Sequence, residues 1–395
     1  MHPPPYRRKA ALTALLASLA PVGTSAFSAV RRASTVTSMS AAAAADPISP
    51  DPDPEAGDVA AASRSLGLFA RTPLVPSAPL TELCSGRRVF LKLDALQASG
   101  SFKDRGMAHL CHTLRSEQGI GRLISSSGGN AGLAVATVAP RLDMEVSVVV
   151  PETTKALVVG RLRRLGADVT VHGANWNEAD ALARERADAD DGAAYVSPYD
   201  NPLLWTGHST VVDEVREQLA EEGVGGAPAA IVASVGGGGL LCGIFEGMER
   251  HSWDGAGAAV IAAETVGAAS FGRALETGAV VRLSSIDSVA TSLGALEVTE
   301  VALSRTAGHR GRGGSVSSSL CTDAEAVGAC VRFAEDHRML IEPACGAALA
   351  ALYSDRLREE LLAAIPPEGP IVVEVCGGSG VNLDLLAAWK EEFLS

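Results

Sequence analysis

One lysine in this sequence has neighbours that suit covalent chemistry. Lys103 lies in the stretch Ser99-Gly-Ser-Phe-Lys-Asp-Arg-Gly106, directly after Phe102. A lysine amine, with an ordinary pKa of about 10.4, attacks a carbonyl group at neutral pH only when desolvation or a nearby cation lowers that pKa. We therefore expect Lys103 to act as a nucleophile. The alternative is a basic surface turn that opens a helix.

A run of four glycines predicts an anion site further along the chain. Gly236, Gly237, Gly238 and Gly239 precede Leu240, after an apolar strand and at the start of a helix. Successive backbone N–H groups of such a turn point at one anion, and the helix dipole assists. No Lys-Ser/Thr pair follows, so the turn is not a P-loop. A tight strand-to-helix turn without a ligand is the alternative.

Two further turns follow apolar strands. The stretch 126–132, Ser-Ser-Gly-Gly-Asn-Ala-Gly, groups hydroxyls, N–H groups and an amide where a carboxylate could bind, although a plain helix cap is the alternative. The other turn begins with Cys376, which could also be a small buried hydrophobe. A lysine, a phosphate turn and a carboxylate turn together favour pyridoxal 5′-phosphate as cofactor, with Cys376 at its ring nitrogen.

Short apolar strands alternate with amphipathic helices, which predicts parallel sheets covered on both faces and an α/β fold of two domains with a cleft between them. We expect strands at 88–93, 122–125, 146–150, 169–171, 229–234, 259–264 and 371–375, and helices at 107–117, 131–139, 156–165 and 178–187. Ser304–Ser318 is predicted to be a surface loop. The predicted large domain comprises 65–97 and 208–395, and the small domain 98–207.

Composition excludes several classes of protein. The 395 residues are 47% apolar and 20% charged, which is ordinary for globular chains, and the net charge of −13 argues against nucleic acid or an anionic membrane as partner. A small molecule is the expected partner. The seven cysteines lack CxxC or CxxxH spacing, so neither a disulfide framework nor a zinc site is indicated.

The N-terminal residues have the composition of a targeting segment. Residues 1–45 contain no Asp or Glu but five Arg or Lys, with a basic start, a short apolar run and a small-residue site at Thr24-Ser-Ala26. Phe27 and a Ser-, Thr- and Arg-rich stretch follow, which resembles the bipartite plastid presequence of algae with complex plastids. A mitochondrial presequence is the alternative. Residues 46–64 are rich in Pro, Asp, Ala and Ser, so we expect a disordered linker.

Five motifs together resemble the fold type II pyridoxal-phosphate enzymes and, within them, the animal-type L-serine dehydratase/L-threonine deaminase family. They are Ser-Phe-Lys-x-Arg-Gly, Ser-x-Gly-Asn-Ala-Gly, Ser-Val-Gly-Gly-Gly-Gly-Leu-Leu-Cys-Gly, Glu-Pro-Ala-Cys-Gly-Ala-Ala-Leu-Ala (342–350) and Cys-Gly-Gly-Ser. The similarity covers about residues 66–393. It implies two open three-layer α/β domains with the cofactor in the cleft between them, and a homodimer.

The resemblance also implies roles for single residues. Lys103 would hold the cofactor as a Schiff base, Phe102 would pack on its ring and Cys376 would meet the pyridine nitrogen. The phosphate would lie on 236–240, that is Gly236, Gly237, Gly238, Gly239 and Leu240. Asn130 would bond the 3′ oxygen of the cofactor, and the substrate carboxylate would lie on Ser127, Gly128, Asn130 and Ala131.

A monovalent-cation site, for K⁺, is a further implication of the resemblance. It would be made largely of backbone oxygens and would involve Gly236, Glu264, Ala268, Ser270, Leu293 and Ala295. From the sequence alone, Glu264 could equally be a surface carboxylate. Three residues depart from the family pattern: Gly128 replaces alanine or serine, Ser292 replaces alanine and Thr206 replaces an acidic residue.

The expected activity is β-elimination of water from L-serine or L-threonine, giving pyruvate or 2-oxobutanoate plus ammonia. Within the same fold, the alternatives are threonine synthase, serine racemase and a cysteine-synthase-like replacement enzyme. A non-catalytic amino-acid sensor is an alternative from another class, against which the intact Lys103 argues. The preference between serine and threonine stays open, because one methyl group changes binding by only about 1 to 3 kcal/mol.

Overall fold

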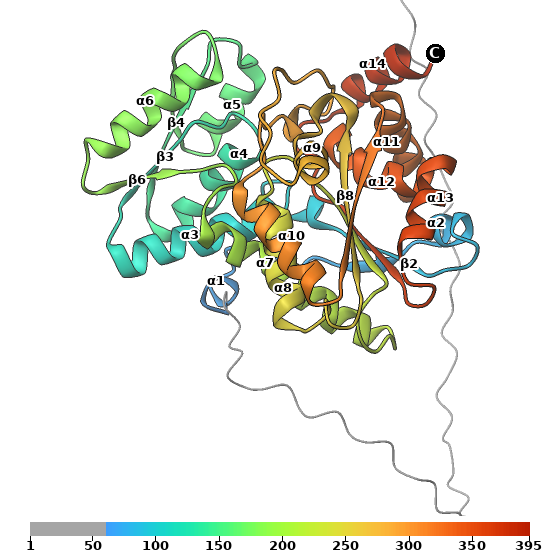
Figure 1. Cartoon of the computed structure of the whole chain (residues 1–395). Helices are drawn as coiled ribbons and strands as arrows, with labels where there is room; N and C mark the ends of the chain where they lie inside the picture. Colours follow the sequence, from blue (N-terminus) through green and yellow to red (C-terminus); the bar gives the residue numbers. More distant parts are fainter. Residues whose placement is uncertain (1–60) are drawn as a thin grey trace, which may run out of the picture. The chain divides into compact units, whose positions relative to one another are not determined.

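Two β-sheets of different size organise the structure, a computed structural model that describes residues 61–395. The smaller sheet has the strand order β5-β4-β3-β6, and its four strands are parallel (Figure 1). Its strands are β3 (Arg122–Ser125), β4 (Glu145–Val150), β5 (Asp168–Val171) and β6 (Ala193–Val196). The loops that follow the carboxyl ends of β3 to β6 therefore leave from one edge of this sheet.

The larger sheet has the order β1-β2-β10-β7-β8-β9 and is parallel except for β1, which is antiparallel to β2. Its strands are β1 (Leu74–Pro76), β2 (Val89–Lys92), β7 (Ala230–Ser234), β8 (Ala259–Thr265), β9 (Ser315–Cys321) and β10 (Ile371–Glu374). Because β2 pairs with β10, the sheet joins two parts of the chain between which the smaller sheet is inserted.

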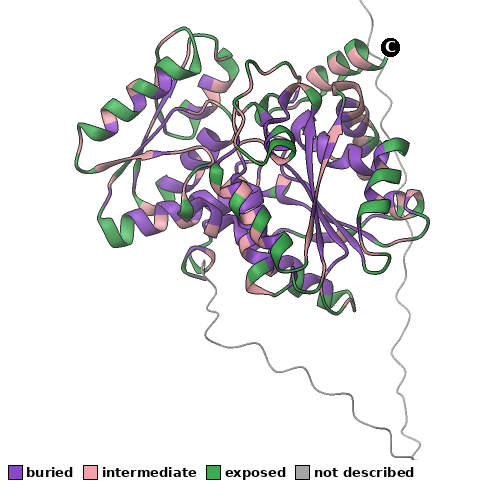
Figure 2. Ribbon diagram, viewed as in Figure 1, coloured by how far each residue is buried: buried purple, intermediate pink, exposed green. Residues whose placement is uncertain are grey.

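Helices cover both sheets (Figure 1). Helix α6 packs on β3, β4 and β6, whereas α12 packs on β7, β8 and β9 and is buried along its whole length. Figure 2 shows the buried residues concentrated in the strands of the larger sheet and on the inner faces of its helices. The helices with their bounds are α1 (Ala61–Ser65), α2 (Ala78–Leu83), α3 (Lys103–Gln118), α4 (Asn130–Val138), α5 (Ala156–Arg164), α6 (Trp176–Asp188), α7 (Pro202–Glu221), α8 (Gly239–Arg250), α9 (Ser270–Thr277), α10 (Glu300–Gly311), α11 (Asp323–His337), α12 (Pro343–Tyr353), α13 (Asp355–Ala364) and α14 (Leu383–Leu394).

The expected α/β fold with parallel sheets is confirmed, and every predicted strand is present with small changes at its ends. The predicted surface loop Ser304–Ser318 is wrong. Its first half, 304–311, belongs to α10, and its end is the start of the edge strand β9. Four of the seven residues of β9 are serines, at 315 and 317–319, and they hide its pattern, because an edge strand buries less of its surface than a central one.

The predicted domain boundaries stay a prediction. All strands of the smaller sheet fall within 98–207, and those of the larger sheet fall within 65–97 and 208–395. The predicted targeting segment 1–45 and most of the linker 46–64 lie outside the described residues. The linker is nevertheless too long as predicted, because α1 begins at Ala61 and Ser63 is buried beside α3, where its hydroxyl donates to the Ala108 carbonyl at 3.4 Å.

The seven cysteines are all free and buried. Among residues 61–395, no helix combines the length and apolar character that crossing a membrane requires.

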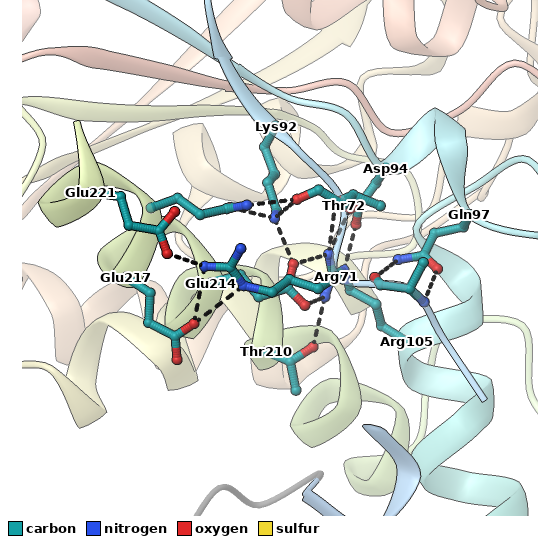
Figure 3. Close-up of polar contacts among 12 residues, drawn as sticks. Arg71, Thr72, Lys92, Asp94, Gln97, Arg105, Thr210, Glu214, Glu217 and Glu221 are labelled. Atoms are coloured by element: carbon teal, nitrogen blue, oxygen red, sulfur yellow. Dashed lines mark hydrogen bonds and ion pairs between the residues drawn. The ribbon is translucent and has the colours of Figure 1, made fainter. Parts of the chain in front are cut away.

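A buried network of charged side chains connects β2, α3 and α7 (Figure 3). The Arg105 guanidinium forms ion pairs with Asp94 at 2.7 Å and with Glu214 at 2.8 Å. Lys92 pairs with the second oxygen of Glu214 at 2.6 Å, and Thr72 donates to Asp94 at 2.6 Å. All four charged side chains are fully buried, and their two positive and two negative charges balance. This balance and the shared hydrogen bonds offset the free energy of removing the ions from water.

Replacing Arg105 by methionine should destabilise the fold by about 3–5 kcal/mol, because buried Asp94 loses its ion-pair partner and Glu214 keeps only Lys92. Urea unfolding of the wild type and the variant measures the loss. Arg122→Met is the matched control, since Arg122 pairs with Glu145 and Asp190 at an exposed site where removal costs about 0–1 kcal/mol. Equal losses of unfolding free energy in the two variants would contradict the larger contribution that we assign to the buried network.

Candidate active site

One cavity collects the residues that the sequence singled out. It has a volume of about 790 Å³, and loops and helices that follow strands of both sheets line it. All predicted cofactor and substrate residues lie on its wall: Phe102, Lys103, Ser127, Gly128, Asn130, Ala131, Gly236, Gly237, Gly238, Gly239, Leu240 and Cys376. Three of the turns concerned directly follow the carboxyl ends of β3, β7 and β10, which explains why segments far apart in sequence meet.

Backbone hydrogen bonds hold the lysine loop against the Cys376 turn. Phe102 N donates to the Cys376 carbonyl at 2.9 Å, and Gly378 N donates to the Gly100 carbonyl at 3.1 Å. The approach is close enough that a Cβ on Gly377 would lie 2.9 Å from the Ser101 Cβ. Lys103, the first residue of α3, is thereby placed on the same cavity wall as the Cys376 thiol.

The Lys103 amine lies in surroundings that weaken its affinity for a proton. Its Nζ donates to the Pro198 carbonyl at 2.8 Å and lies 4.9 Å from the centre of the Phe102 ring. Burial lowers the pKa of Lys103 from 10.5 to about 8, against the weaker opposite influence of Cys376 and Glu342. A large fraction of this amine is therefore neutral near pH 8, as a nucleophile or general base requires.

The four glycines form a turn in which side chains do not fit. Gly238 has a φ of +92° and precedes α8, which begins at Gly239 without a side-chain cap. A Cβ on Gly237 would lie 2.4 Å from the Tyr199 ring, and one on Gly239 would lie 2.7 Å from the Tyr199 carbonyl. The bare backbone at the N-terminus of α8 can therefore come close to an anion.

The turn after β3 offers a second helix N-terminus to the cavity. Helix α4 begins at Asn130, and its N-cap residue Gly129 makes no side-chain cap. The Ser127 hydroxyl accepts a hydrogen bond from Gly129 N at 3.3 Å, and Ser127 and Gly128 both line the cavity. The remaining N–H groups of this first turn suit a substrate carboxylate.

The Cys376 thiol is buried and stays protonated. A hydrogen bond with Cys345 and burial raise the pKa of Cys376 well above its ordinary value. A neutral thiol on the cavity wall can approach an uncharged ring nitrogen without bringing a charge with it.

Comparison with known proteins identifies this arrangement. The family described as pyridoxal-phosphate dependent enzyme matches residues 66–377. The chain belongs to this family. L-serine dehydratase/L-threonine deaminase of Mus musculus is 43% identical over 82% of this chain and 95% of that protein. L-serine dehydratase of Dictyostelium discoideum is 36% identical over 80% of this chain and 90% of that protein. A crystal structure of a fungal L-serine ammonia-lyase from Rhizomucor miehei matches with a TM-score of 0.75 and 34% identity, over 82% of this chain and 99% of that chain.

The cavity fits the cofactor of this family of pyridoxal-phosphate dependent enzymes. Lys103 presents an amine whose pKa is lowered to about 8, and the glycine turn presents bare backbone, since Cβ atoms on 237–239 would clash with Tyr199 or Val298. Lys103 would hold the aldehyde carbon of the cofactor, 236–240 its phosphate and Cys376 its ring nitrogen. The resemblance and the fold expected from it are thus confirmed.

Of the six residues predicted for a cation site, Gly236, Leu293 and Ala295 line the cavity, and Ala268, Ser270 and Glu264 are buried but not part of its lining. The Ser270 hydroxyl donates to the Gly236 carbonyl at 3.5 Å. Glu264 is fully buried, so the alternative of a surface carboxylate is wrong. Its oxygens accept hydrogen bonds from Phe271 N and Gly272 N at 2.8 and 2.7 Å, while burial raises its pKa to about 8.

Sequence reasoning did not assign a role to Glu342, which also lines the cavity. Its Oε1 accepts a hydrogen bond from Asn130 Nδ2 at 2.6 Å, and Ser292, one of the departures from the family pattern, is hydrogen-bonded to the same carboxyl. Glu342 belongs to the motif 342–350, but no spacing in the sequence indicates that it contacts Asn130. Of the other two departures, Gly128 lines the cavity whereas Thr206 lies on α7 outside its wall.

The reaction of Lys103 with pyridoxal phosphate should accelerate as the pH rises through about 8, because only the neutral amine attacks the aldehyde. The absorbance of the protein-bound cofactor, followed after mixing with apoprotein at a series of pH values, measures this rate. Lys103→Ala is the control for reaction at other amines. A profile centred near 10.5 would mean that the cavity leaves this lysine unperturbed.

Replacing Gly238 by alanine should weaken the binding of pyridoxal phosphate at least about tenfold. The added Cβ would lie 2.8 Å from Val298 Cγ2 at a φ of +92°, and left-handed backbone alone costs an L-residue about 1–2 kcal/mol. Titration of apoprotein with the cofactor measures the affinity. Gly223→Ala is the matched control, with a φ of +73° and open space around its Cβ, and should leave the affinity unchanged.

Proposed function

We propose that this protein is a pyridoxal-phosphate dependent ammonia-lyase that acts on L-serine and L-threonine. The single observation that carries the proposal is the convergence of Lys103, the glycine turn and the serine turn 126–132 on one cavity. The activities named for its relatives from mouse, Dictyostelium and Rhizomucor support the same reaction. The products would be pyruvate or 2-oxobutanoate, together with ammonia.

When bound, pyridoxal phosphate supplies an electron sink that makes the α-hydrogen of the amino acid acidic and eases departure of its β-hydroxyl group. The N-terminus of α4, with Ser127, binds the substrate carboxylate and thereby orients the α-hydrogen toward Lys103. The neutral Lys103 amine, which a pKa of about 8 provides in quantity, removes that proton. The α-hydrogen and the β-hydroxyl group are lost together as one water molecule, and the released enamine takes up water to give the oxo acid and ammonia.

The cavity wall also bears on the alternative reactions. Ser127, Asn130 and Ser292 are among the hydroxyl and amide side chains that line it. The Ser292 hydroxyl is already hydrogen-bonded to the Glu342 carboxyl. A serine racemase requires a second proton donor on the face of the substrate opposite the lysine, so D-serine formation is the reaction that distinguishes this alternative.

Three finer features extend the proposal. A K⁺ ion near Glu264 and the Gly236 carbonyl would compensate a carboxylate that is otherwise fully buried. We further propose a homodimer, as the family resemblance implies. Delivery to a plastid, with the mitochondrion as the alternative, rests on the acid-free composition of 1–45, which lies outside the described residues.

Purified protein loaded with pyridoxal phosphate should convert L-serine and L-threonine to equal amounts of oxo acid and ammonia. Lys103→Ala should reduce the rate by about 10²- to 10⁴-fold, the range for loss of a positioned acid–base group. Lys390→Ala, at an exposed position of α14, is the matched control and should behave as the wild type. Parallel assays with and without K⁺ test the cation, and a chiral assay detects D-serine. Absence of oxo acid from both substrates would reject the proposal.

A further inference from the structure

The Glu342 carboxyl occupies the N-cap position of α12 but does not cap that helix. A carboxylate at an N-cap commonly accepts hydrogen bonds from the N–H groups of the first turn. Here the side chain instead points into the cavity, and Pro343 follows at the first helical position. Glu342 is 4% exposed, so its polar contacts lie within the cavity wall.

Three groups donate to this carboxyl. Asn130 Nδ2 donates to Oε1 at 2.6 Å, Gly380 N donates to Oε2 at 3.2 Å, and the Ser292 hydroxyl is hydrogen-bonded to the carboxyl. A Cβ on Gly380 would lie 2.6 Å from Glu342 Oε2, so a larger residue there would have to displace the carboxyl group. A site where every neighbour donates requires an acceptor on both oxygens, which an ionised carboxylate is and a glutamine is not.

Asn130 is held at both ends of its amide. While its nitrogen donates to Glu342, its oxygen accepts a hydrogen bond from the Ser379 hydroxyl. Reversing the amide would place its oxygen against a carboxylate that accepts only, so Glu342 determines which way the amide points. One N–H of Asn130 then remains for a ligand in the cavity.

The same contacts connect the two sheets. Asn130 begins α4, after the strand β3 of the smaller sheet, whereas Glu342 and Ser379 belong to segments that flank α12 and β10 of the larger sheet. Arg161, on α5, also donates to the Ser379 carbonyl at 2.5 Å. The substrate turn is thereby fastened to the wall that carries Cys376.

We propose that Glu342 is a positioning residue, whose carboxylate orients the Asn130 amide so that its free N–H faces the cofactor and whose loss acts through Asn130. The inference rests on the proposed function, because Asn130 serves a cofactor and a substrate only if the cavity holds them. Among the described residues, Glu342 makes no hydrogen bond with the glycine turn or with Lys103.

A double-mutant cycle tests the proposal. Glu342→Gln, Asn130→Ala and the double variant are compared with the wild type for the dissociation constant of pyridoxal phosphate, by titration of apoprotein, and for kcat/KM with L-serine. Glu342→Gln should weaken cofactor binding by about 10- to 100-fold, since a buried hydrogen bond to a charged group contributes about 1.5–3 kcal/mol. Because Glu342 acts through Asn130, the double variant should lose no more than Asn130→Ala alone.

Glu374→Gln is the matched control, because Glu374 is a buried carboxyl outside the cavity wall whose two oxygens have no hydrogen-bond partner among the described residues. It should bind the cofactor within about twofold of the wild type. Losses that add in the double variant, wild-type affinity in Glu342→Gln or an equal loss in Glu374→Gln would each overturn the proposal. If Glu342→Gln does not fold, Glu342→Asp takes its place in the cycle.

The design separates this inference from the proposed function. Cofactor titration contains no amino acid, so it reads the orientation of Asn130 whatever the substrate is. A wild-type protein that binds pyridoxal phosphate but releases no oxo acid would reject the proposed function. The dissociation constants of the double-mutant cycle would still test the role of Glu342. A wild type active on L-serine with an additive cycle would reject the positioning role alone.

Discussion

The buried ion pairs of Arg105 are the constraint on which the placement of Lys103 depends. Arg105 stands two residues after Lys103, in the first turn of α3, and both Asp94 and Glu214 hold its guanidinium. A buried guanidinium with two carboxylate partners has a single favourable position, so the start of α3 cannot rotate or slide without breaking these pairs. The position of the Lys103 amine is therefore fixed by charged side chains that do not line the cavity.

Desolvation shifts Lys103 and Cys376 toward their neutral forms. Burial lowers the pKa of Lys103 to about 8, and a hydrogen bond with Cys345 together with burial raises the pKa of Cys376. Burial also raises the pKa of Glu342, but hydrogen bonds from Ser292, Asn130 and Gly380 oppose this effect and favour the ionised carboxylate. A cavity that resists net charge and supplies local donors is suited to a base that must be neutral before it acts.

The parts of the site that follow a single strand could be predicted from the sequence, because a glycine turn after an apolar strand has a local signature. The glycines 236–239 and Lys103 are examples. The contact between Glu342 and Asn130 spans 212 residues and has no such signature. The ion pairs of Arg105 could not be predicted for the same reason. In the sequence, Asp94 and Glu214 are ordinary charged residues, and they meet Arg105 only when β2, α3 and α7 pack together. Strand β9 was missed because its serines mask the alternation.

An acidic protein selects anionic ligands here through its backbone. The net charge is −13, yet two helices, α4 and α8, direct their N-termini at the same cavity, and neither has a side-chain cap. Uncapped N–H groups keep their hydrogen-bonding capacity for a ligand, and each helix dipole adds about half a positive charge. The N-terminus of α8 is open because its glycines allow a ligand to come close. That of α4 is open because Gly129, which precedes Asn130, has no side chain to cap the helix. Two anionic groups on one bound species, a phosphate and a carboxylate, would satisfy both ends at once, which neither would do alone.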